Sequence, residues 1–321
     1  MDPRQRAGNP YSLLMTTMVL WGVSFSSSKT VVGDVPHPVA AFLRFGGGAL
    51  ALLVALRLVD RGRGPVPARR VWPAMAAGVL GVFAYNGLFF WGLSLAPSLD
   101  AGILVPVMSP VLTGAFLLVS GRERADLGRV AGLGLGLAGA VVFFVGAGGG
   151  AGGGAQRLWG DALFLLSAVC WAAYTVAGPR VMAGIAPLRA TTYATCAGAV
   201  LLGVLAAPDL ATTEWDRLPV GTWLNVAYLA IGAAAVANVL YYRGVRQVGP
   251  ATASLMMFTV PVINTLCATL VLGESFGPLQ VAGAGVLLTG AALAATRGRL
   301  PRRAGRGGVR RATEGAGETV R

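Results

Sequence analysis

The stretch SPVLTGAFLLVSGRERADLGRVAGLGLGLAG, residues 109–139, has a related copy later in the chain, VPVINTLCATLVLGESFGPLQVAGAGVLLTG, residues 260–290. The second copy begins 151 residues after the first, so that Pro110 falls on Pro261. Two further glycines and the tripeptide Val-Ala-Gly coincide at the same distance. Self-similarity at a fixed distance predicts that the chain contains two copies of one structural unit.

The composition predicts that both units lie in a membrane. Of the 321 residues, 55% are hydrophobic and only 12% are charged, whereas a soluble domain has about a quarter charged residues. A helix that crosses the hydrocarbon core needs about 20 mainly apolar residues. Ten such segments follow one another: residues 11–32, 38–59, 73–94, 98–119, 127–147, 158–180, 187–207, 219–241, 250–272 and 278–296. We therefore expect an all-α integral membrane protein with ten transmembrane helices.

The basic residues predict which way these segments face. With the N-terminus in the cytoplasm, 22 basic residues fall on the cytoplasmic side, and the opposite loops hold only Arg157 and Arg217. Cytoplasmic loops of membrane proteins are enriched in Lys and Arg. We therefore expect both termini on the cytoplasmic side of an inner membrane. The net charge of +13 then reflects membrane-flanking arginines and contacts with membrane lipids, and we expect no nucleic-acid partner.

A glycine-rich stretch divides the ten segments into five and five. The expected organisation is a cytoplasmic N-terminus (1–10), a first five-helix repeat (11–147), an external linker (148–157), a second five-helix repeat (158–296) and a disordered, Arg-rich cytoplasmic tail (297–321). A unit of five helices starts and ends on opposite sides, so its copy must insert upside down. Inverted repeats are typical of secondary transporters, whose substrate site lies near the midplane where the halves meet.

Several motifs make the chain resemble the EamA family of ten-helix permeases, part of the drug/metabolite transporter superfamily. They are LWGVSF followed by lysine at 20–29, FLRF at 42–45, SP at 109–110, GRER at 121–124 and GPATASLMMFTVPVINTLCATLVLGES at 249–275. The resemblance covers about residues 11–296. It implies an inner-membrane carrier built from two inverted five-helix bundles, and it does not imply a particular substrate.

Two cations inside expected helices are candidate substrate-binding residues. Lys29 is the only lysine of the chain and lies in the last turns of the first segment, and Arg44 lies about two turns into the second. Lys29 either extends to the membrane surface or faces the mouth of a central cavity and attracts an anionic substrate group. Arg44 either binds a substrate carboxylate or stabilises the fold. Each needs a counter-charge, from Asp34, Glu274 or the substrate.

Repeat-related residues supply two further pairs of candidates. After a slip of one residue, Asn86 falls on Asn238, and an amide in hydrocarbon needs a partner. We expect both to face a central polar cavity. Pro110 and Pro261 each remove a backbone donor near mid-membrane. They are interpreted either as simple kinks or as hinges that move during transport.

Other polar and aromatic side chains at inward-facing positions complete the predicted substrate site. The alternative for each is packing or an interfacial aromatic belt. They are Ser24, Tyr85, Trp91, Trp171, Tyr174, Tyr241, Met257 and Asn264.

The remaining features are interpreted as structural. Gly128, Gly132 and Gly136 have the GxxxG spacing that lets helices approach closely, within the scaffold or in a homodimer. Asp100 and Asp161 lie near outer helix ends, and we expect them to be solvated. The three cysteines fit neither a metal site nor a disulfide framework, so we expect no metal and no cofactor.

These patterns favour a secondary transporter, working as an exporter by alternating access on small metabolites, amino acids or drug-like compounds. A gradient must supply the energy, because no ATPase motif is present. The alternatives are a non-transporting membrane scaffold and an intramembrane enzyme. We expect no enzymatic activity, because the chain has a single histidine and no motif of paired catalytic groups.

Overall fold

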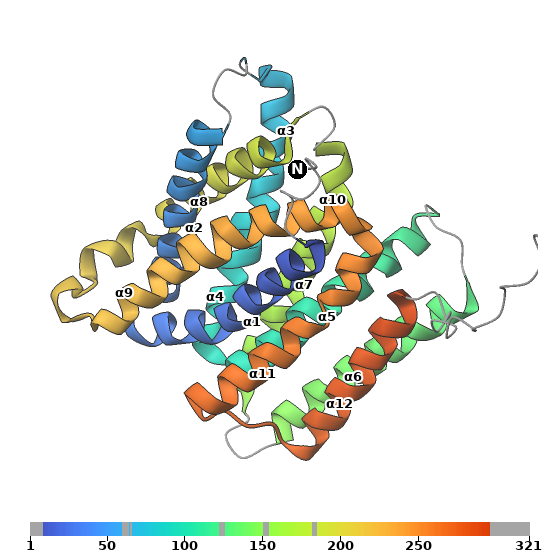
Figure 1. Cartoon of the computed structure of the whole chain (residues 1–321). Coiled ribbons are helices and arrows are strands. Elements are labelled where there is room, and N and C mark those ends of the chain that lie inside the picture. The colour runs from blue at the N-terminus through green and yellow to red at the C-terminus, as the bar shows by residue number, and fades with distance from the viewer. Residues whose placement is uncertain are drawn as a thin grey trace, which may run out of the picture.

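The computed structural model describes residues 9–59, 64, 66–121, 126–149, 154–181 and 185–295, and within these it is helical and contains no strand. Figure 1 shows the helices packed side by side. They are α1 (Pro10–Asp34), α2 (His37–Val59), α3 (Ala68–Gly78), α4 (Tyr85–Leu95), α5 (Ser98–Val119), α6 (Leu127–Gly149), α7 (Ala155–Val181), α8 (Pro187–Thr212), α9 (Val220–Ala227), α10 (Ala237–Met256), α11 (Thr259–Leu272) and α12 (Pro278–Ala295). The expected linker and terminal segments lie largely outside the described residues.

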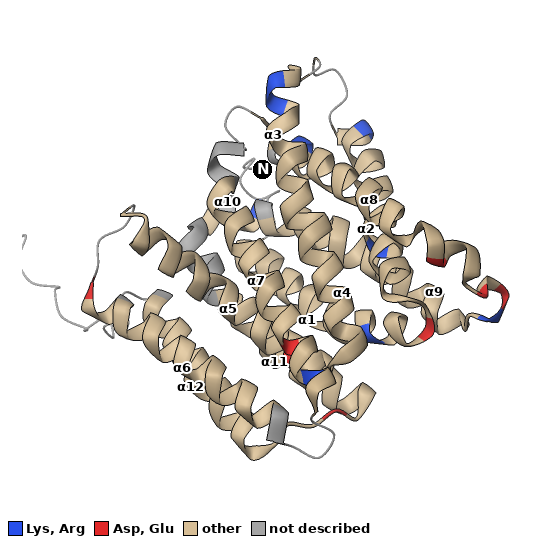
Figure 2. Ribbon diagram, turned by 180° about the vertical axis from the view of Figure 1, so that it is seen from behind, with Lys and Arg blue, Asp and Glu red and all other residues tan. Residues whose placement is uncertain are grey.

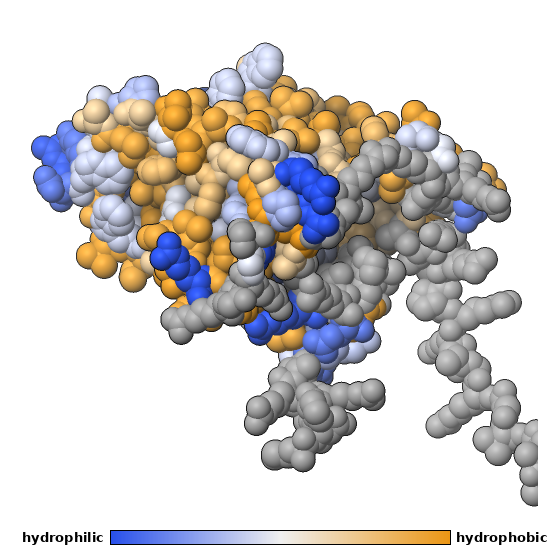
Figure 3. Space-filling model, turned by 90° about the horizontal axis from the view of Figure 1, so that it is seen from above, coloured by the Kyte–Doolittle hydropathy of each residue, from blue (hydrophilic) through white to orange (hydrophobic). Residues whose placement is uncertain are grey.

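The all-helical architecture follows from the apolar composition, because backbone groups in lipid must satisfy their hydrogen bonds within their own segment. Within the described residues, seven helices are long and apolar enough to cross a membrane: His37–Val59, Ala68–Leu95, Ser98–Val119, Val130–Ala147, Ala155–Ala177, Leu188–Thr212 and Val220–Tyr241. Large apolar side chains such as Val119 (88% exposed) and Leu270 (81% exposed) point outward. Figure 3 shows such apolar residues over much of the described surface. The expected all-α membrane class is confirmed.

Both halves contain a π-helical segment at the same place in the repeat. The segment η2 (Val79–Ala84) joins α3 to α4, and η4 (Tyr228–Val236) joins α9 to α10. Asn86 and Asn238 follow these segments closely, and each amide donates to the carbonyl oxygen four residues earlier, at 2.8 Å and 2.7 Å. π segments disturb the regular backbone ladder and occur often at functional sites. The repeat seen in the sequence therefore also appears in the backbone, as one π segment in each half.

The pair α6 and α12 shows how the two copies are related in space. A Cβ on Gly132 would lie 2.4 Å from the backbone nitrogen of Ala294, and a Cβ on Gly283 would lie 2.4 Å from that of Phe143. With the repeat offset, Gly132 corresponds to Gly283 and Phe143 to Ala294, so the same contact is made twice with the helices exchanged. The predicted close approach of the glycine face is confirmed, and it lies between α6 and α12 of one chain.

Polar contacts join the helix ends at one end of the bundle, which we call the polar end. There the Thr222 hydroxyl at the start of α9 donates to Asp34 at the end of α1. Glu274, just after α11, accepts hydrogen bonds from Ser98 at the start of α5. The repeat-related helices α5 and α11 therefore run antiparallel. Figure 2 shows the basic residues of α3 at the opposite end from the acidic residues near α9 and α11.

The structure corrects one expected boundary. Residues 242–249 were expected to be a loop, but α10 continues through them, and the chain breaks at residues 257–258 instead. One proline, here at position 250, removes only one ladder bond and is tolerated within a helix of a membrane protein. As a result Pro261 lies in the first turn of α11, where a missing N–H costs little, whereas Pro110 lies inside α5. The two prolines are therefore not equivalent helix kinks.

Candidate functional site

Arg44 of α2 has its guanidinium group among side chains of α1, α2 and α4. Its Nη1 donates to the Ser28 hydroxyl of α1 at 3.3 Å. The guanidinium carbon lies 5.1 Å from the centroid of the Phe45 ring and 6.0 Å from that of Phe90, within the range of cation–π attraction. Within the described residues, Nε is buried without a partner and no carboxylate pairs with this arginine. The site therefore holds a positive charge that the described part of the chain does not balance.

A tyrosine at the end of η2 and another at the start of η4 interact with this charge. Tyr85, the first residue after η2, and Tyr228, the first residue of η4, are both electrostatic neighbours of Arg44. The Tyr228 hydroxyl also donates to the Leu20 carbonyl oxygen of α1 at 2.6 Å. Each half thus contributes a tyrosine beside the same cation. An unbalanced arginine with hydroxyl groups next to it can hold a carboxylate by charge-assisted hydrogen bonds.

Two further aromatic rings follow Tyr85 in a chain of ring contacts. The Tyr85 ring lies 5.1 Å from Trp171, and Trp171 lies 5.6 Å from Tyr174, both on α7. The structure therefore brings four of the predicted site residues together: Arg44, Tyr85, Trp171 and Tyr174. A separate pair, Tyr241 and Met257, lies in contact through the Tyr241 hydroxyl and the methionine sulfur at 4.0 Å.

Other predicted residues lie apart from this group. Ser24 donates within its own helix to Trp21 at 2.7 Å. Asn264 is buried and donates to the Ser98 carbonyl oxygen at 3.0 Å. Trp91 is 47% exposed and stacks on His37 at 6.0 Å. Their predicted roles toward a substrate stay predictions.

Lys29 contacts backbone at the polar end. Its Nζ donates to the carbonyl oxygens of Leu93 at 2.6 Å and Ala96 at 2.8 Å. These carbonyls end α4, where a cation complements both the unpaired acceptors and the helix dipole. This partner could not be predicted from the sequence, because α4 and α1 are far apart along the chain.

Glu274 caps the N-terminus of α5, whereas Lys29 caps the C-terminus of α4. The side chain accepts from the Ser98 backbone N–H at 2.9 Å, the Ser98 hydroxyl at 2.8 Å and the Leu99 N–H at 2.8 Å. α5 begins after Pro97, which supplies no side-chain cap. A carboxylate from the α11–α12 connection thus satisfies the free N–H groups of this helix start.

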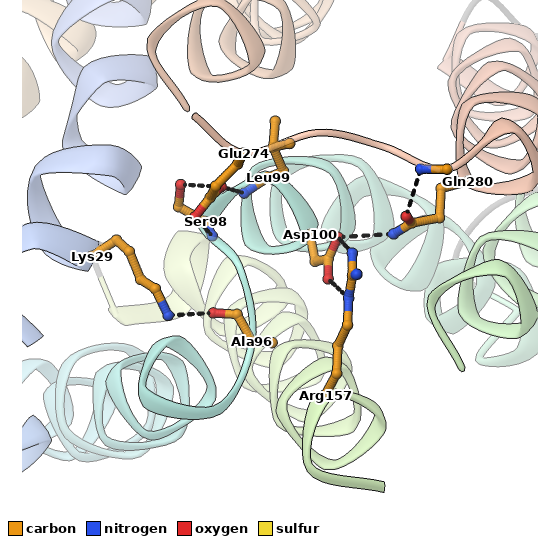
Figure 4. A network of polar contacts seen from close by, with 9 residues as sticks. Lys29, Ala96, Ser98, Leu99, Asp100, Arg157, Glu274 and Gln280 are labelled. Atoms are coloured by element: carbon orange, nitrogen blue, oxygen red, sulfur yellow. Dashed lines mark hydrogen bonds and ion pairs between the residues drawn. The ribbon is translucent and has the colours of Figure 1, made fainter. Parts of the chain in front are cut away.

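Asp100 forms the centre of a polar network, shown in Figure 4. It accepts from Arg157 Nε at 2.7 Å, from Arg157 Nη2 at 2.9 Å and from Gln280 at 3.1 Å. Asp100 and Asp161 are both 0% exposed, so the expectation that they are solvated is wrong. The sequence did contain one signal, because an acid inside an apolar run is costly unless it has partners. The partners themselves, Arg157 and Gln280, could not be foreseen.

Comparison with known proteins agrees with this geometry. The sequence profile described as the EamA-like transporter family matches residues 9–145 and again residues 158–296. The chain belongs to the EamA-like transporter family. Its two matched regions correspond to the two copies seen in the sequence, and residues outside them form the glycine-rich connection and the two ends of the chain.

Three similar proteins place this EamA-like transporter among its relatives. It is 32% identical to the aromatic amino acid exporter YddG of Ancylobacter novellus, over 88% of this chain and 94% of the relative. It is 27% identical to a probable terminal-alkyne amino-acid exporter of Streptantibioticus cattleyicolor, over 87% and 91%. It is also 27% identical to the inner membrane transporter YedA of Escherichia coli, over 87% and 88%. The chain is therefore a multi-pass protein of the inner membrane.

Proposed function

We propose that this protein exports small metabolites that have a carboxylate next to an apolar body, with neutral and aromatic amino acids as the first candidates. The membership of the EamA-like family and the similarity to two amino acid exporters support export of small metabolites. The substrate class is inferred from the site itself.

The observation that supports this substrate class is the environment of Arg44. A buried cation is costly when nothing compensates it, and the described residues offer Arg44 one hydroxyl and aromatic faces but no carboxylate. A substrate carboxylate would supply the missing charge, and Tyr85 and Trp171 would contact the apolar part of the substrate. Because Arg44 interacts with Tyr85 of the first half and Tyr228 of the second, one substrate would contact both halves.

We infer that ten helices cross the membrane as two inverted halves, with both termini in the cytoplasm. The ten are the seven long apolar helices together with α1, α11 and α12, which pack against them. The polar end then faces outward. Alternating access would exchange the packing of the two halves around Arg44, and Pro110 and the chain break before Pro261 are the proposed flexible points.

Binding to the purified protein tests the role of Arg44. L-Phenylalanine should bind, whereas phenethylamine, which lacks the carboxylate, should bind at least tenfold more weakly, consistent with loss of a charged hydrogen bond. Arg44→Gln should weaken phenylalanine binding by a similar factor, and the exposed control Arg217→Gln should leave it unchanged. Equal binding of the two ligands by the wild type would contradict the proposal, whether or not the Arg44 variant folds.

A further inference from the structure

Two buried carboxyl groups meet at the polar end of the bundle. Asp161 lies four residues after Arg157 on α7, so both side chains lie on one face of that helix. Arg157 donates hydrogen bonds from two nitrogens to Asp100 of α5. Asp161 therefore lies close to the Asp100 carboxyl, and the two groups interact electrostatically. Both acids are fully buried.

The donors are distributed unequally between the two acids. Asp100 receives two hydrogen bonds from Arg157 and one from Gln280. Neither oxygen of Asp161 receives a donor from the described residues. An ionised carboxylate is an acceptor only, so two ionised groups cannot hydrogen-bond to each other. The contact is satisfied when Asp161 has a proton and donates it to Asp100.

The charges around the two acids also indicate that Asp161 has a proton. Asp100 from α5 and Arg157 from α7 itself face Asp161 directly. Glu274 from the α11–α12 connection and Lys29 from α1 lie one step further away. Among the described side chains, α4 and α6, which also pack on α7, present no charged group at this end. Three acids thus face two cations, and one proton makes the group neutral.

We propose that Asp161 is a proton-binding site and that its proton, donated to Asp100, couples export to a proton gradient. The coupling part rests on the proposed transport function, whereas the proton-binding part does not. Proton transfer here needs only water, because a proton from the outer side binds a carboxylate oxygen of Asp161 and is released to water on the cytoplasmic side, which breaks only the O–H bond formed on uptake. Loss of the proton would leave two carboxylates in contact, and their repulsion would separate α5 from α7 at this end.

Infrared spectroscopy of the full-length purified protein tests the site without any substrate. The wild type at neutral pH should show the carbonyl stretch of a protonated carboxyl group that shifts in heavy water. Asp161→Asn should lose that band, and Asp216→Asn, an exposed acid, should keep it. Labelling the wild type with carbon-13 aspartate should shift the band, which assigns it to Asp without any variant. No such band in the wild type, or an unchanged band in Asp161→Asn, would overturn the proposal.

Proteoliposomes test the coupling. With L-phenylalanine as the probe, a pH gradient should accelerate wild-type transport relative to simple exchange of phenylalanine. In Asp161→Asn the rate of gradient-driven transport divided by the rate of exchange should fall toward one, whatever rate of exchange remains. In Asp216→Asn this ratio should match that of the wild type. A ratio unchanged in Asp161→Asn would overturn the coupling. Failure of exchange in the wild type would instead count against the proposed substrate, and the infrared result would still decide the proton site.

Discussion

Lys29 shows how a single residue can have a structural task that its sequence position conceals. Alone in an apolar helix, it suggests either a surface contact or an anion site. In the structure its ammonium group donates to the last carbonyls of α4, and this interaction lies at the end of the bundle that also contains Glu274 and Asp100. The position of Lys29 in the chain was informative, but its partner is a backbone segment more than sixty residues away.

Replacing Lys29 with methionine should therefore lower the stability of the protein. The two carbonyls would lose a charged donor, which costs about 1–3 kcal/mol when a buried acceptor is left unpaired. A thermal unfolding assay in detergent should show a lower midpoint for Lys29→Met, and Lys29→Arg should retain part of the stability because the charge remains. Unchanged stability together with a selective loss of carboxylated substrates would show that Lys29 binds substrate instead.

The predictability of the site differs between its two parts. Arg44, Tyr85 and Trp171 could be selected from the sequence because a cation and amphipathic rings stand out among apolar residues. The network of Asp100, Arg157 and Asp161 could not be assembled, since each member lies near a helix end where a solvated charge is the ordinary expectation. Only the packing of α5 against α7 removes them from water.

At the scale of elements, glycine positions determine which helices touch. On α6, a Cβ at Gly139 would lie 2.3 Å from the backbone nitrogen of Leu287 in α12, whereas a Cβ at Gly134 would meet nothing within 4 Å. The GxxxG spacing predicted a close contact correctly, but it could not identify the partner helix or exclude a second copy of the chain. That information appears only when both repeats are placed together.

These two glycines provide a matched test of the α6–α12 contact. Gly139→Ala should destabilise the protein by about 1–3 kcal/mol, the usual cost of overpacking. Gly134→Ala should be neutral or stabilise it by up to about 1 kcal/mol through better helix propensity. Thermal unfolding of both variants measures the difference. Equal effects would contradict the close contact.

The helix boundaries show where local sequence signals fail. The Gly-Pro pair at 249–250 indicates a turn, yet α10 continues to Met256 and the chain breaks at 257–258, in a stretch with no glycine or proline. The two π segments were also not foreseen, because a single inserted residue leaves the apolar composition unchanged. The late end of α10 and the two π segments arise from tertiary packing. Each lies next to predicted site residues in the chain.

For the whole molecule, the structure combines internal symmetry with an asymmetric charge distribution. The repeats are visible in the contacts of α6 with α12 and in the paired π segments. The buried network of Asp100, Arg157 and Asp161 occurs at the polar end, and Pro10, on which Asp161 falls at the offset of 151 residues, is not acidic. Duplication explains the repeated helix packing. The acidic residue that only one half contains makes the two ends of the bundle chemically different.

Cysteine labelling in intact cells tests the orientation. Gly154→Cys, at the start of α7, and Ser120→Cys, in the turn after α5, are both exposed positions at opposite ends of the bundle. In a background with the native cysteines replaced by serine, a membrane-impermeant reagent should label position 154 and leave position 120 unlabelled until the cells are permeabilised. Labelling of both positions, or of position 120 alone, would contradict the proposed topology.

The most direct test of the account is counterflow in proteoliposomes made with the wild-type protein. Vesicles loaded with unlabelled L-phenylalanine and diluted into a trace of labelled phenylalanine should accumulate label transiently above its equilibrium level. Phenethylamine inside the vesicles should not support this exchange, because it has no carboxylate for Arg44. Accumulation driven equally well by phenethylamine, or no accumulation with any protein amino acid, would contradict the claim that this chain carries small carboxylated metabolites across the membrane.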